Sequence, residues 1–223
     1  MQRLECPAVP TAVIKEKFMV FMIPVQGYFS ENCYIYADDK TKHGFLIDPG
    51  AEPEKILDCI EKNGITIKKI LLTHGHFDHF GAVHALCKAL SVPVFAYSDE
   101  YLCDPKLNLS RFCTNDMVID YAEWFDDGDI ITLSETGEIS LKVIYTPGHT
   151  EDSVIFYDEK AHIAFVGDTI FKGSIGTDQY PGGNKMQLYN SIENIIFLLP
   201  DETVLFSGHS EKTTIGIEKK RYS

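Results

Sequence analysis

The sequence predicts an α/β fold, a sandwich of two β-sheets with helices on the outer faces. Short apolar segments bounded by turn residues outnumber segments of helical periodicity, and both kinds occur in each half of the chain. Such elements bury their apolar faces when helices cover the outside of two packed sheets. A chain of 223 residues, 44% of them hydrophobic, can form one such core. We expect a single domain at residues 18–223 after an extension at residues 1–17.

The first half of the chain predicts a β-meander and then a strand-to-helix turn. Asp48-Pro49-Gly50 ends the meander, and Asn63-Gly64 ends the first helix. In chain order, we expect strands at residues 18–23, 32–37 and 44–47, a helix at 53–62, a strand at 68–73, a helix from 78 to 90 and a short strand at 93–96.

The second half predicts more strands and two further helices. Residues 97–117 have weak periodicity and predict a long, partly helical loop, a type of segment that often covers a binding site. In chain order, we then expect strands at residues 130–133, 140–145, 153–157 and 162–166, a helix at 184–199, a strand at 203–206 and a short helix at 214–220.

The segment Thr73-His74-Gly75-His76-Phe77-Asp78-His79 contains four side chains that can bind a metal ion. His74 and His76 point the same way in an extended backbone. Asp78 and His79 lie where the chain turns into the helix and can reach a second point nearby. Without a metal, so many polar groups in a small volume would need other partners. We therefore predict one site with room for two cations.

Two short patterns recur in the chain and add candidate ligands. Residues 71–76 and 144–149 share an apolar pair, Thr, any residue, Gly and His. Residues 165–169 and 206–210 share Phe, any residue, Gly, a potential ligand and a hydroxyl residue. If the two halves pack as similar units, these strand ends meet at one edge. The ligands that the patterns add are His149, Asp168 and His209.

The ordered motifs His-x-His-x-Asp-His, Gly-His-Thr, Gly-Asp-Thr and Gly-His resemble the signature of metallo-β-lactamase fold hydrolases, and in particular of short glyoxalase II-like members. The resemblance covers most of the chain and implies a four-layered αββα sandwich of two mixed β-sheets. It also implies how the ligands are divided: one ion on His74, His76 and His149, a second on Asp78, His79 and His209, and Asp168 bridging the two.

A ligand set of His and Asp suits zinc, our first candidate, and also iron or manganese. Each ion would keep an open position, as catalytic metals do. Two divalent ions outweigh the charges of Asp78 and Asp168, so the site favours a developing oxyanion. Water on such an ion ionises at a pKa of roughly 7. The resemblance then implies that a metal-bridging hydroxide cleaves a thioester or related small acyl substrate, with Asp78 and Asp168 as catalytic residues.

Four residues beside the ligands are expected to orient them. Asp48 matches the Asp-Pro-Gly turn of the family, although a simple strand-ending turn remains the alternative interpretation. Thr73, Thr150 and Thr169 flank ligands and are expected to hold ring nitrogens or carboxylate oxygens.

Substrate recognition is predicted from the loop after Asp168, which resembles that of short glyoxalase II-like proteins. Those proteins carry Arg or Lys after Ser-Ile-Gly, where this chain has Thr177. A basic residue there helps to bind anionic thioesters, so recognition of glutathione stays open. Lys172 is a candidate replacement or an ordinary surface lysine. Our candidate substrate-binding residues are Lys172, Thr177 and Tyr180.

An alternative function is an oxidoreductase. Persulfide dioxygenases resemble this family and use one iron held by two His and one Asp, which correspond here to His74, His149 and Asp168. They tend to lose the second metal site. The second ligand set is retained here, and this favours the hydrolase: Asp78, His79 and His209.

Composition excludes several classes of partner. A net charge of −13 repels phosphate backbones, so we expect no nucleic acid partner. Six Cys without a Cys-x-x-Cys pair, and no signal-peptide pattern at residues 1–17, predict reduced thiols and a cytoplasmic location. No apolar segment is long enough to span a bilayer, so no membrane association is expected. The oligomeric state stays open.

Overall fold

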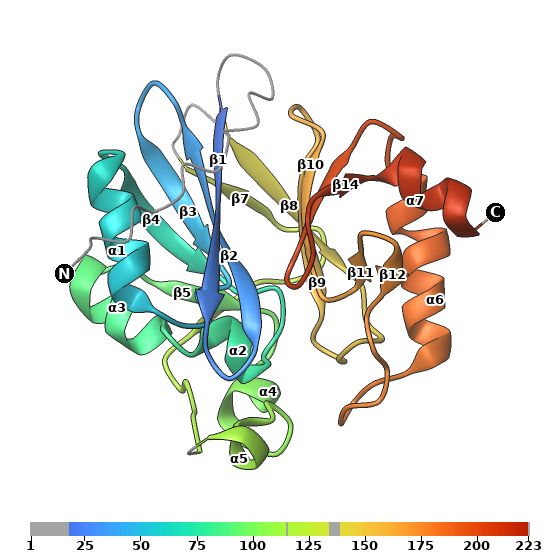
Figure 1. Ribbon diagram of the computed structural model, residues 1–223, viewed down its shortest axis with the longest axis horizontal. Helices are drawn as coiled ribbons and strands as arrows, with labels where there is room; N and C mark the ends of the chain where they lie inside the picture. The colour runs from blue at the N-terminus through green and yellow to red at the C-terminus, as the bar shows by residue number, and fades with distance from the viewer. Residues whose placement is uncertain (1–17, 115, 134–138, 223) are drawn as a thin grey trace.

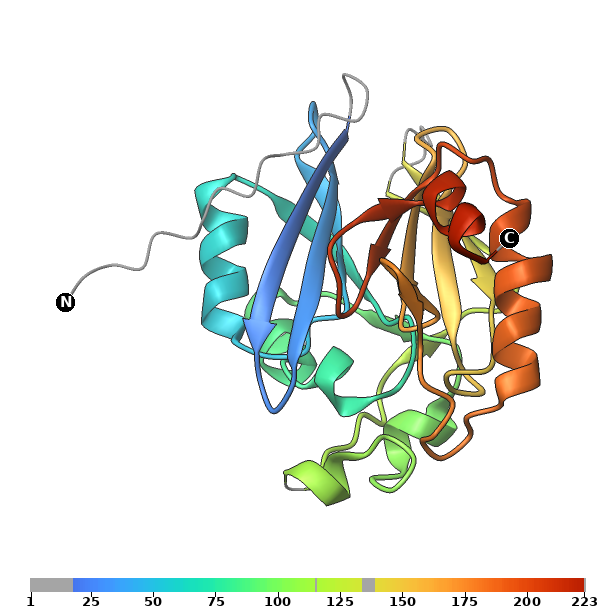
Figure 2. The ribbon, with the colours of Figure 1, turned by 45° about the vertical axis from the view of Figure 1, so that its right-hand side comes forward.

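The computed structural model describes residues 18–114, 116–133 and 139–222. The extension expected at residues 1–17 lies outside the described residues. Two six-stranded sheets pack face to face, and helices cover both outer faces (Figures 1 and 2). This arrangement confirms the predicted four-layered αββα sandwich. No helix among the described residues has both the length and the apolar character needed to cross a membrane.

The first sheet contains the strands from the first half of the chain. It begins with an antiparallel meander and continues with parallel strands, so it is mixed. Helices α1 (Pro53–Lys62) and α3 (Val83–Leu90) lie on its outer face (Figure 1). Its strands, in spatial order, are β1 (Phe18–Gln26), β2 (Ser30–Asp38), β3 (His43–Ile47), β4 (Thr66–Leu71), β5 (Val94–Ala96) and β6 (Glu123–Trp124).

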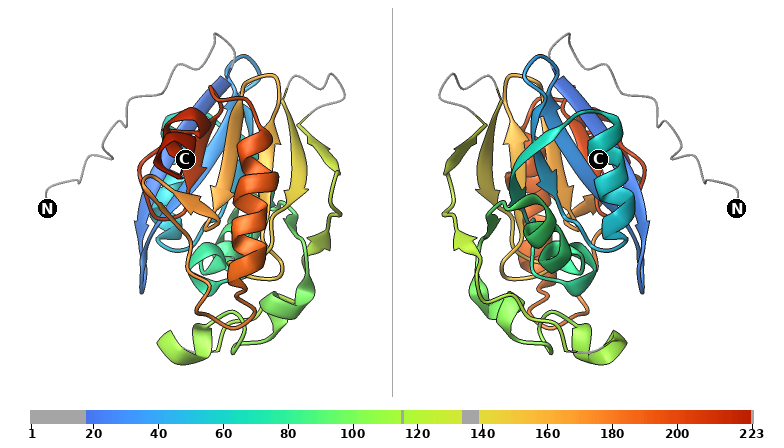
Figure 3. Two further views of the ribbon diagram at one scale, coloured as in Figure 1. Left: turned by 90° about the vertical axis from the view of Figure 1, so that its right-hand side faces the viewer. Right: turned by 90° about the vertical axis from the view of Figure 1, so that its left-hand side faces the viewer.

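The second sheet contains strands from the second half. Among its described strands, the β10–β13 pair alone is parallel. Helices α6 (Lys185–Asn194) and α7 (Ile215–Tyr222) cover its outer face, opposite to α1 and α3 (Figure 3). Its strands, in spatial order, are β14 (Thr213–Thr214), β13 (Val204–Ser207), β10 (Ile163–Gly167), β9 (Val154–Asp158), β8 (Ser140–Tyr145) and β7 (Ile130–Thr132).

Strand alternation divides the apolar core into three layers. Along β10, Phe165 points into the layer between the two sheets, and Val166 points into the layer beneath α6. Along β4, Leu71 joins the layer between the sheets, and Ile70 joins the layer beneath α1 and α3. Successive side chains of a strand face opposite sides, so each sheet is buried on both faces. The apolar core therefore packs against both faces of each sheet.

The helix predicted from residue 78 to residue 90 is in fact two helices. α2 (Phe77–Phe80) and α3 are separated at Gly81 and Ala82. The amide of Ala82 donates a hydrogen bond of 3.0 Å to the carbonyl of Pro49, in the turn after β3. A Cβ at position 81 would lie only 2.4 Å from the carbonyl oxygen of Gly50. A contact with a distant turn thus interrupts a segment whose apolar periodicity is continuous.

Other boundaries differ in smaller ways. The predicted helix at 184–199 ends at Asn194 and continues as the 3-10 turn η1 (Ile196–Leu198). The loop at 97–117 is partly helical as predicted, with α4 (Asp99–Cys103) and α5 (Ser110–Cys113) at one end of the sandwich (Figure 3). Four two-residue strands among the described residues are not predicted from the sequence, and two of them, β11 (Ile170–Phe171) and β12 (Ser174–Ile175), form a small hairpin beside the predicted ligand Asp168.

Candidate metal centre

Three imidazole rings meet after strands β4 and β8. The Nδ1 atom of His76 lies 3.1 Å from Nε2 of His74 and 3.1 Å from Nε2 of His149. Burial lowers the pKa of His76 to about 3 and also lowers the pKa of His74 and His149. The rings are therefore neutral at physiological pH. We call this set site 1.

Contacts of the Nδ1 atoms, on the side away from the common point, fix the orientation of two rings in site 1. Nδ1 of His149 donates to the backbone carbonyl of Thr177 at 2.8 Å, and Nδ1 of His74 lies 3.1 Å from the hydroxyl of Thr73. A ring that donates through Nδ1 has its lone pair on Nε2. His74 and His149 thus present Nε2 to the common point, and His76 presents Nδ1. Converging lone pairs repel each other unless a shared cation lies between them.

A second set comes from α2 and from the end of β13. One ligand atom each from Asp78, His79 and His209 lies within 4.8 Å of the others. Nε2 of His209 is 3.4 Å from Oδ2 of Asp78, and Nδ1 of His209 donates to the carbonyl of Ser30 at 2.6 Å. Nδ1 of His79 is turned away, toward Asp48. These rings also present Nε2, and we call this set site 2.

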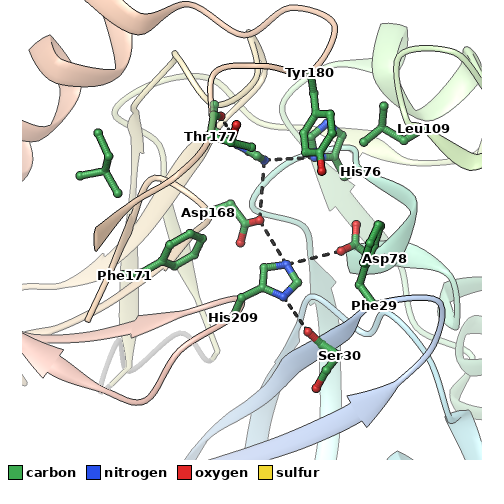
Figure 4. A pocket seen from close by; sticks show the side chains of 12 residues that line it. Phe29, Ser30, His76, Asp78, Leu109, Asp168, Phe171, Thr177, Tyr180 and His209 are labelled. Carbon is green, nitrogen blue, oxygen red and sulfur yellow. Dashed lines mark hydrogen bonds and ion pairs between the residues drawn. The ribbon is translucent and has the colours of Figure 1, made fainter. Parts of the chain in front are cut away.

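Asp168, directly after β10, lies between the two sites. Its Oδ1 is 3.5 Å from Nε2 of His79, and its Oδ2 is 3.2 Å from Nε2 of His209 and 3.7 Å from Nε2 of His149. Figure 4 shows this carboxylate beside His209, which also reaches Asp78. One carboxylate therefore contacts both sites, and the fold brings together all seven ligands predicted from the sequence.

The seven side chains fit two divalent cations. Nε2 of His79 and Oδ1 of Asp168 are buried without a hydrogen-bond partner among the described residues. Buried polar atoms are nearly always paired. For His79, burial opposes the charged form, but the carboxylates of Asp168 and Asp48 outweigh it and raise the pKa. Negative charge is thus in excess at site 2, as a cation would require. Nitrogen and oxygen ligands suit zinc, iron and manganese.

Asp48 supports both sites from one buried position. Its Oδ2 accepts hydrogen bonds from Nδ1 of His79 at 3.0 Å and from the hydroxyl of Thr73 at 2.6 Å. Its Oδ1 accepts the backbone N–H of Thr73 at 2.8 Å. Thr73 in turn contacts His74, so Asp48 reaches site 2 directly and site 1 through Thr73.

The other residues expected to orient ligands make different contacts. The hydroxyl of Thr150 bonds to that of Ser153 at 2.6 Å, and the hydroxyl of Thr169 lies 3.4 Å from that of Thr146. These two threonines stabilise the loops that carry ligands and do not hold the ligand atoms. Lys172 is exposed and forms an ion pair with Glu211, so it does not line the cavity over the metal sites.

An open cavity of about 390 Å³ lies over the two sites. Ligands from both sites form its floor, and Thr177 and Tyr180, two of the three residues predicted to bind substrate, are in its wall. The ring of Tyr180 meets that of His76 edge-on at 5.6 Å. The apolar part of the wall consists of Phe29, Leu109, Phe171, Ile175 and Tyr180.

Sequence reasoning missed two buried acids near the ligands. Glu31 is 2% exposed and lies 4.0 Å from Nδ1 of His79, and burial raises its pKa. Asp152 lies beneath Gly75 and accepts the Gly75 amide; burial raises its pKa to about 7. The sequence offers little signal for either, because Glu31 is in β2 just after a turn, and Asp152 resembles an ordinary turn residue.

Comparisons with known proteins agree with this geometry. The profile described as Metallo-beta-lactamase superfamily matches residues 27–209. Hydroxyacylglutathione hydrolase GloC of Haemophilus influenzae is 33% identical over 89% of this chain and 94% of its own. The crystal structure of the BLEG-1 B3 metallo-beta-lactamase has a TM-score of 0.84 and 34% identity, and the match covers 91% of this chain and 97% of that one.

A di-iron-bound form of TTHA1623 has a TM-score of 0.77 and 31% identity, and the match covers 90% of this chain and 98% of that one. The family match covers most of the chain and includes all seven predicted ligands. The chain belongs to the metallo-beta-lactamase superfamily and is a metal-dependent hydrolase of that family.

Proposed function

We propose that this protein hydrolyses small thioesters or related acyl compounds with two divalent cations, zinc being the first candidate. The observation that carries the proposal is the pair of ligand sets joined by Asp168 on the floor of one open cavity. The similarity to a relative named hydroxyacylglutathione hydrolase supports a thioester as substrate. The similarity to a structure in a di-iron-bound form supports iron as the second candidate metal.

Two cations, when bound, supply Lewis acidity for an acyl carbonyl and lower the pKa of water. His74, His76 and His149 would hold one ion. Asp78, His79 and His209 would hold the other, and Asp168 would offer an oxygen to each. The protein's part is to fix these ligands in buried positions before the substrate arrives.

Asp78 and Asp168 line the cavity and are the proposed catalytic residues. Burial opposes ionisation of Asp168, but His79 and His209 outweigh it and hold its pKa well below the usual value. A carboxylate at this point accepts a hydrogen bond from the attacking water and orients it toward the acyl carbon. The C–S bond then breaks, the acyl carbon gains the hydroxyl of water, and the thiolate sulfur gains the proton.

Elemental analysis and a substrate panel test the proposal together. The purified protein should hold two metal ions per chain and should release thiol from acyl thioesters under anaerobic conditions. One iron per chain, with oxygen consumption and no thioester hydrolysis, would instead identify an oxidoreductase of the persulfide dioxygenase kind and refute the proposal.

A further inference from the structure

We propose that the preferred substrate is uncharged beyond its reacting carbonyl and carries an apolar acyl chain. This inference rests on the proposed function, because it concerns the same cavity. It concerns the part of the substrate that extends away from the metal ligands, where the sequence resemblance left recognition of anionic glutathione open.

Aromatic side chains flank the metal ligands. Phe171, from the β11–β12 hairpin, lies 6.1 Å from the ring of His209. Phe29, from the turn between β1 and β2, is on the Asp78 side of the cavity, opposite to Phe171 (Figure 4). Tyr180 stands over His76. A substrate that reaches the ligands therefore passes between aromatic surfaces supplied by three separate segments.

Two of these rings are exposed to solvent. Phe29 is 39% exposed and Tyr180 is 41% exposed, and both rings belong to the cavity wall. Apolar groups gathered at the rim of a concave site are typical of ligand-binding surfaces. An apolar acyl chain that covers these rings would remove their surfaces from water and gain binding free energy.

The described wall offers no Lys or Arg side chain to pair with an anion. Two basic residues close to lining residues in the chain are engaged elsewhere: Lys172, which follows Phe171, pairs with Glu211, and Arg111, two residues after Leu109, pairs with Asp116. Apart from the metal ligands, the polar lining residues are the uncharged Ser30, Thr177 and Tyr180.

Charge at longer range acts in the same direction. The chain carries a net charge of −13, so an anionic substrate approaches a repulsive surface. Cations in the two sites would attract a carboxylate placed directly against them. A carboxylate further out in the cavity loses hydration and finds only uncharged hydroxyl groups in the wall, not a cationic side chain. An uncharged group in the same place avoids this cost.

A matched pair of thioesters tests the inference. S-butyryl-N-acetylcysteine and S-butyryl-N-acetylcysteinamide differ only in a carboxylate and a carboxamide. We expect the metal-loaded protein to show a kcat/KM at least about tenfold higher for the carboxamide, because the carboxylate loses hydration in the cavity without meeting a cationic side chain. Added salt should raise kcat/KM for the carboxylate substrate alone. The dissociation constants of the corresponding S-butyl thioethers, which cannot be hydrolysed, should differ in the same direction.

Acyl chain length and two variants test the apolar wall. From acetyl to hexanoyl, kcat/KM should rise by about tenfold or more, because each buried methylene group contributes a few-fold. Phe171→Ala should reduce this rise, whereas Tyr121→Ala, which removes an exposed aromatic ring outside the cavity, should not. Thr177→Arg should raise kcat/KM for the carboxylate substrate.

The possible failures are distinguishable. If the two-metal protein hydrolyses none of these compounds, the proposed function is wrong and the inference falls with it. If it hydrolyses them and the carboxylate substrate equals or exceeds its carboxamide partner, the proposed function stands and this inference is overturned. If Phe171→Ala and Tyr121→Ala change the rise of kcat/KM with acyl chain length equally, the role of the aromatic wall is overturned.

Discussion

Replacing Asp48 by Asn should weaken metal binding at site 2 without disturbing the backbone. Asp48 has a φ of 49°, in the left-handed region, which Asn also tolerates. The substitution keeps the size of the side chain. It can keep the bond from the backbone N–H of Thr73, since the amide retains one oxygen. The other position becomes an NH2 group, which faces Nδ1 of His79 and cannot accept its proton.

Oδ2 is lost as an acceptor for two donors, Nδ1 of His79 and the hydroxyl of Thr73, and the magnitude at site 2 follows from the bond to His79. A hydrogen bond to a charged group contributes about 1.5–3 kcal/mol, and about 1.4 kcal/mol corresponds to a factor of ten in affinity. Site 2 should therefore bind its metal about 10–100 times more weakly, as measured for other residues that orient metal ligands. Site 1 should lose less, because Asp48 reaches His74 only through the hydroxyl of Thr73.

Titration with a metal chelator, followed by elemental analysis, measures both affinities. Thr73→Val is the matched control, because it removes the contact with His74 and leaves His79 bonded to Asp48. It should weaken site 1 more than site 2, the reverse of Asp48→Asn. Unchanged affinity of both sites in Asp48→Asn would refute the orienting role of this carboxylate.

Two further substitutions test the metal centre, and a third tests the buried acid Asp152. Asp168→Ala should lower the metal content and abolish turnover, and full activity with one metal would remove its bridging role. Gly208→Ala should reduce the metal content, because the added Cβ would lie 2.3 Å from Oδ1 of Asp168 and 2.6 Å from Cε1 of His79; Gly64→Ala, which meets no atom within 4 Å, should keep both metals. Asp152→Asn should flatten the pH dependence of the free energy of unfolding. Burial raises the pKa of Asp152 from 3.8 to about 7, so the native state keeps a proton that the unfolded chain loses. The free energy of unfolding of the wild type therefore falls as the pH rises from about 4 to about 7. Above that range the variant should be more stable than the wild type by about 4 kcal/mol in thermal or urea unfolding, and equal pH profiles would contradict this.

The layered fold could be predicted because its strands carry local signals. The β10 segment is short and apolar throughout, as a strand buried on both faces must be, and its Phe165 and Val166 enter different core layers. The break between α2 and α3 had no such signal. It depends on Pro49 and Gly50, which the turn after β3 brings against Gly81, and this contact exists only in the folded chain.

The metal ligands could be predicted from the sequence, whereas the atoms that orient them could not. Each ligand is a His or Asp, a residue type that stands out at the end of a strand. The groups behind the rings do not stand out: His149 donates to the carbonyl of Thr177, and His209 donates to the carbonyl of Ser30. Every residue has a backbone carbonyl, so only the fold shows which ones matter. The sequence predicts a role for the side chain of Thr177, and in the structure its backbone carbonyl accepts the hydrogen bond from His149.

The two kinds of support respond differently to substitution. A ring held by a backbone carbonyl keeps its orientation when the side chain of that residue changes, provided the loop keeps its shape. His149 and His209 are held in this way, whereas His79 depends on the carboxylate of Asp48. Substitutions at Thr177 can therefore alter the cavity wall without releasing His149. The chain can change what it recognises at this position while its metal ligands stay in place.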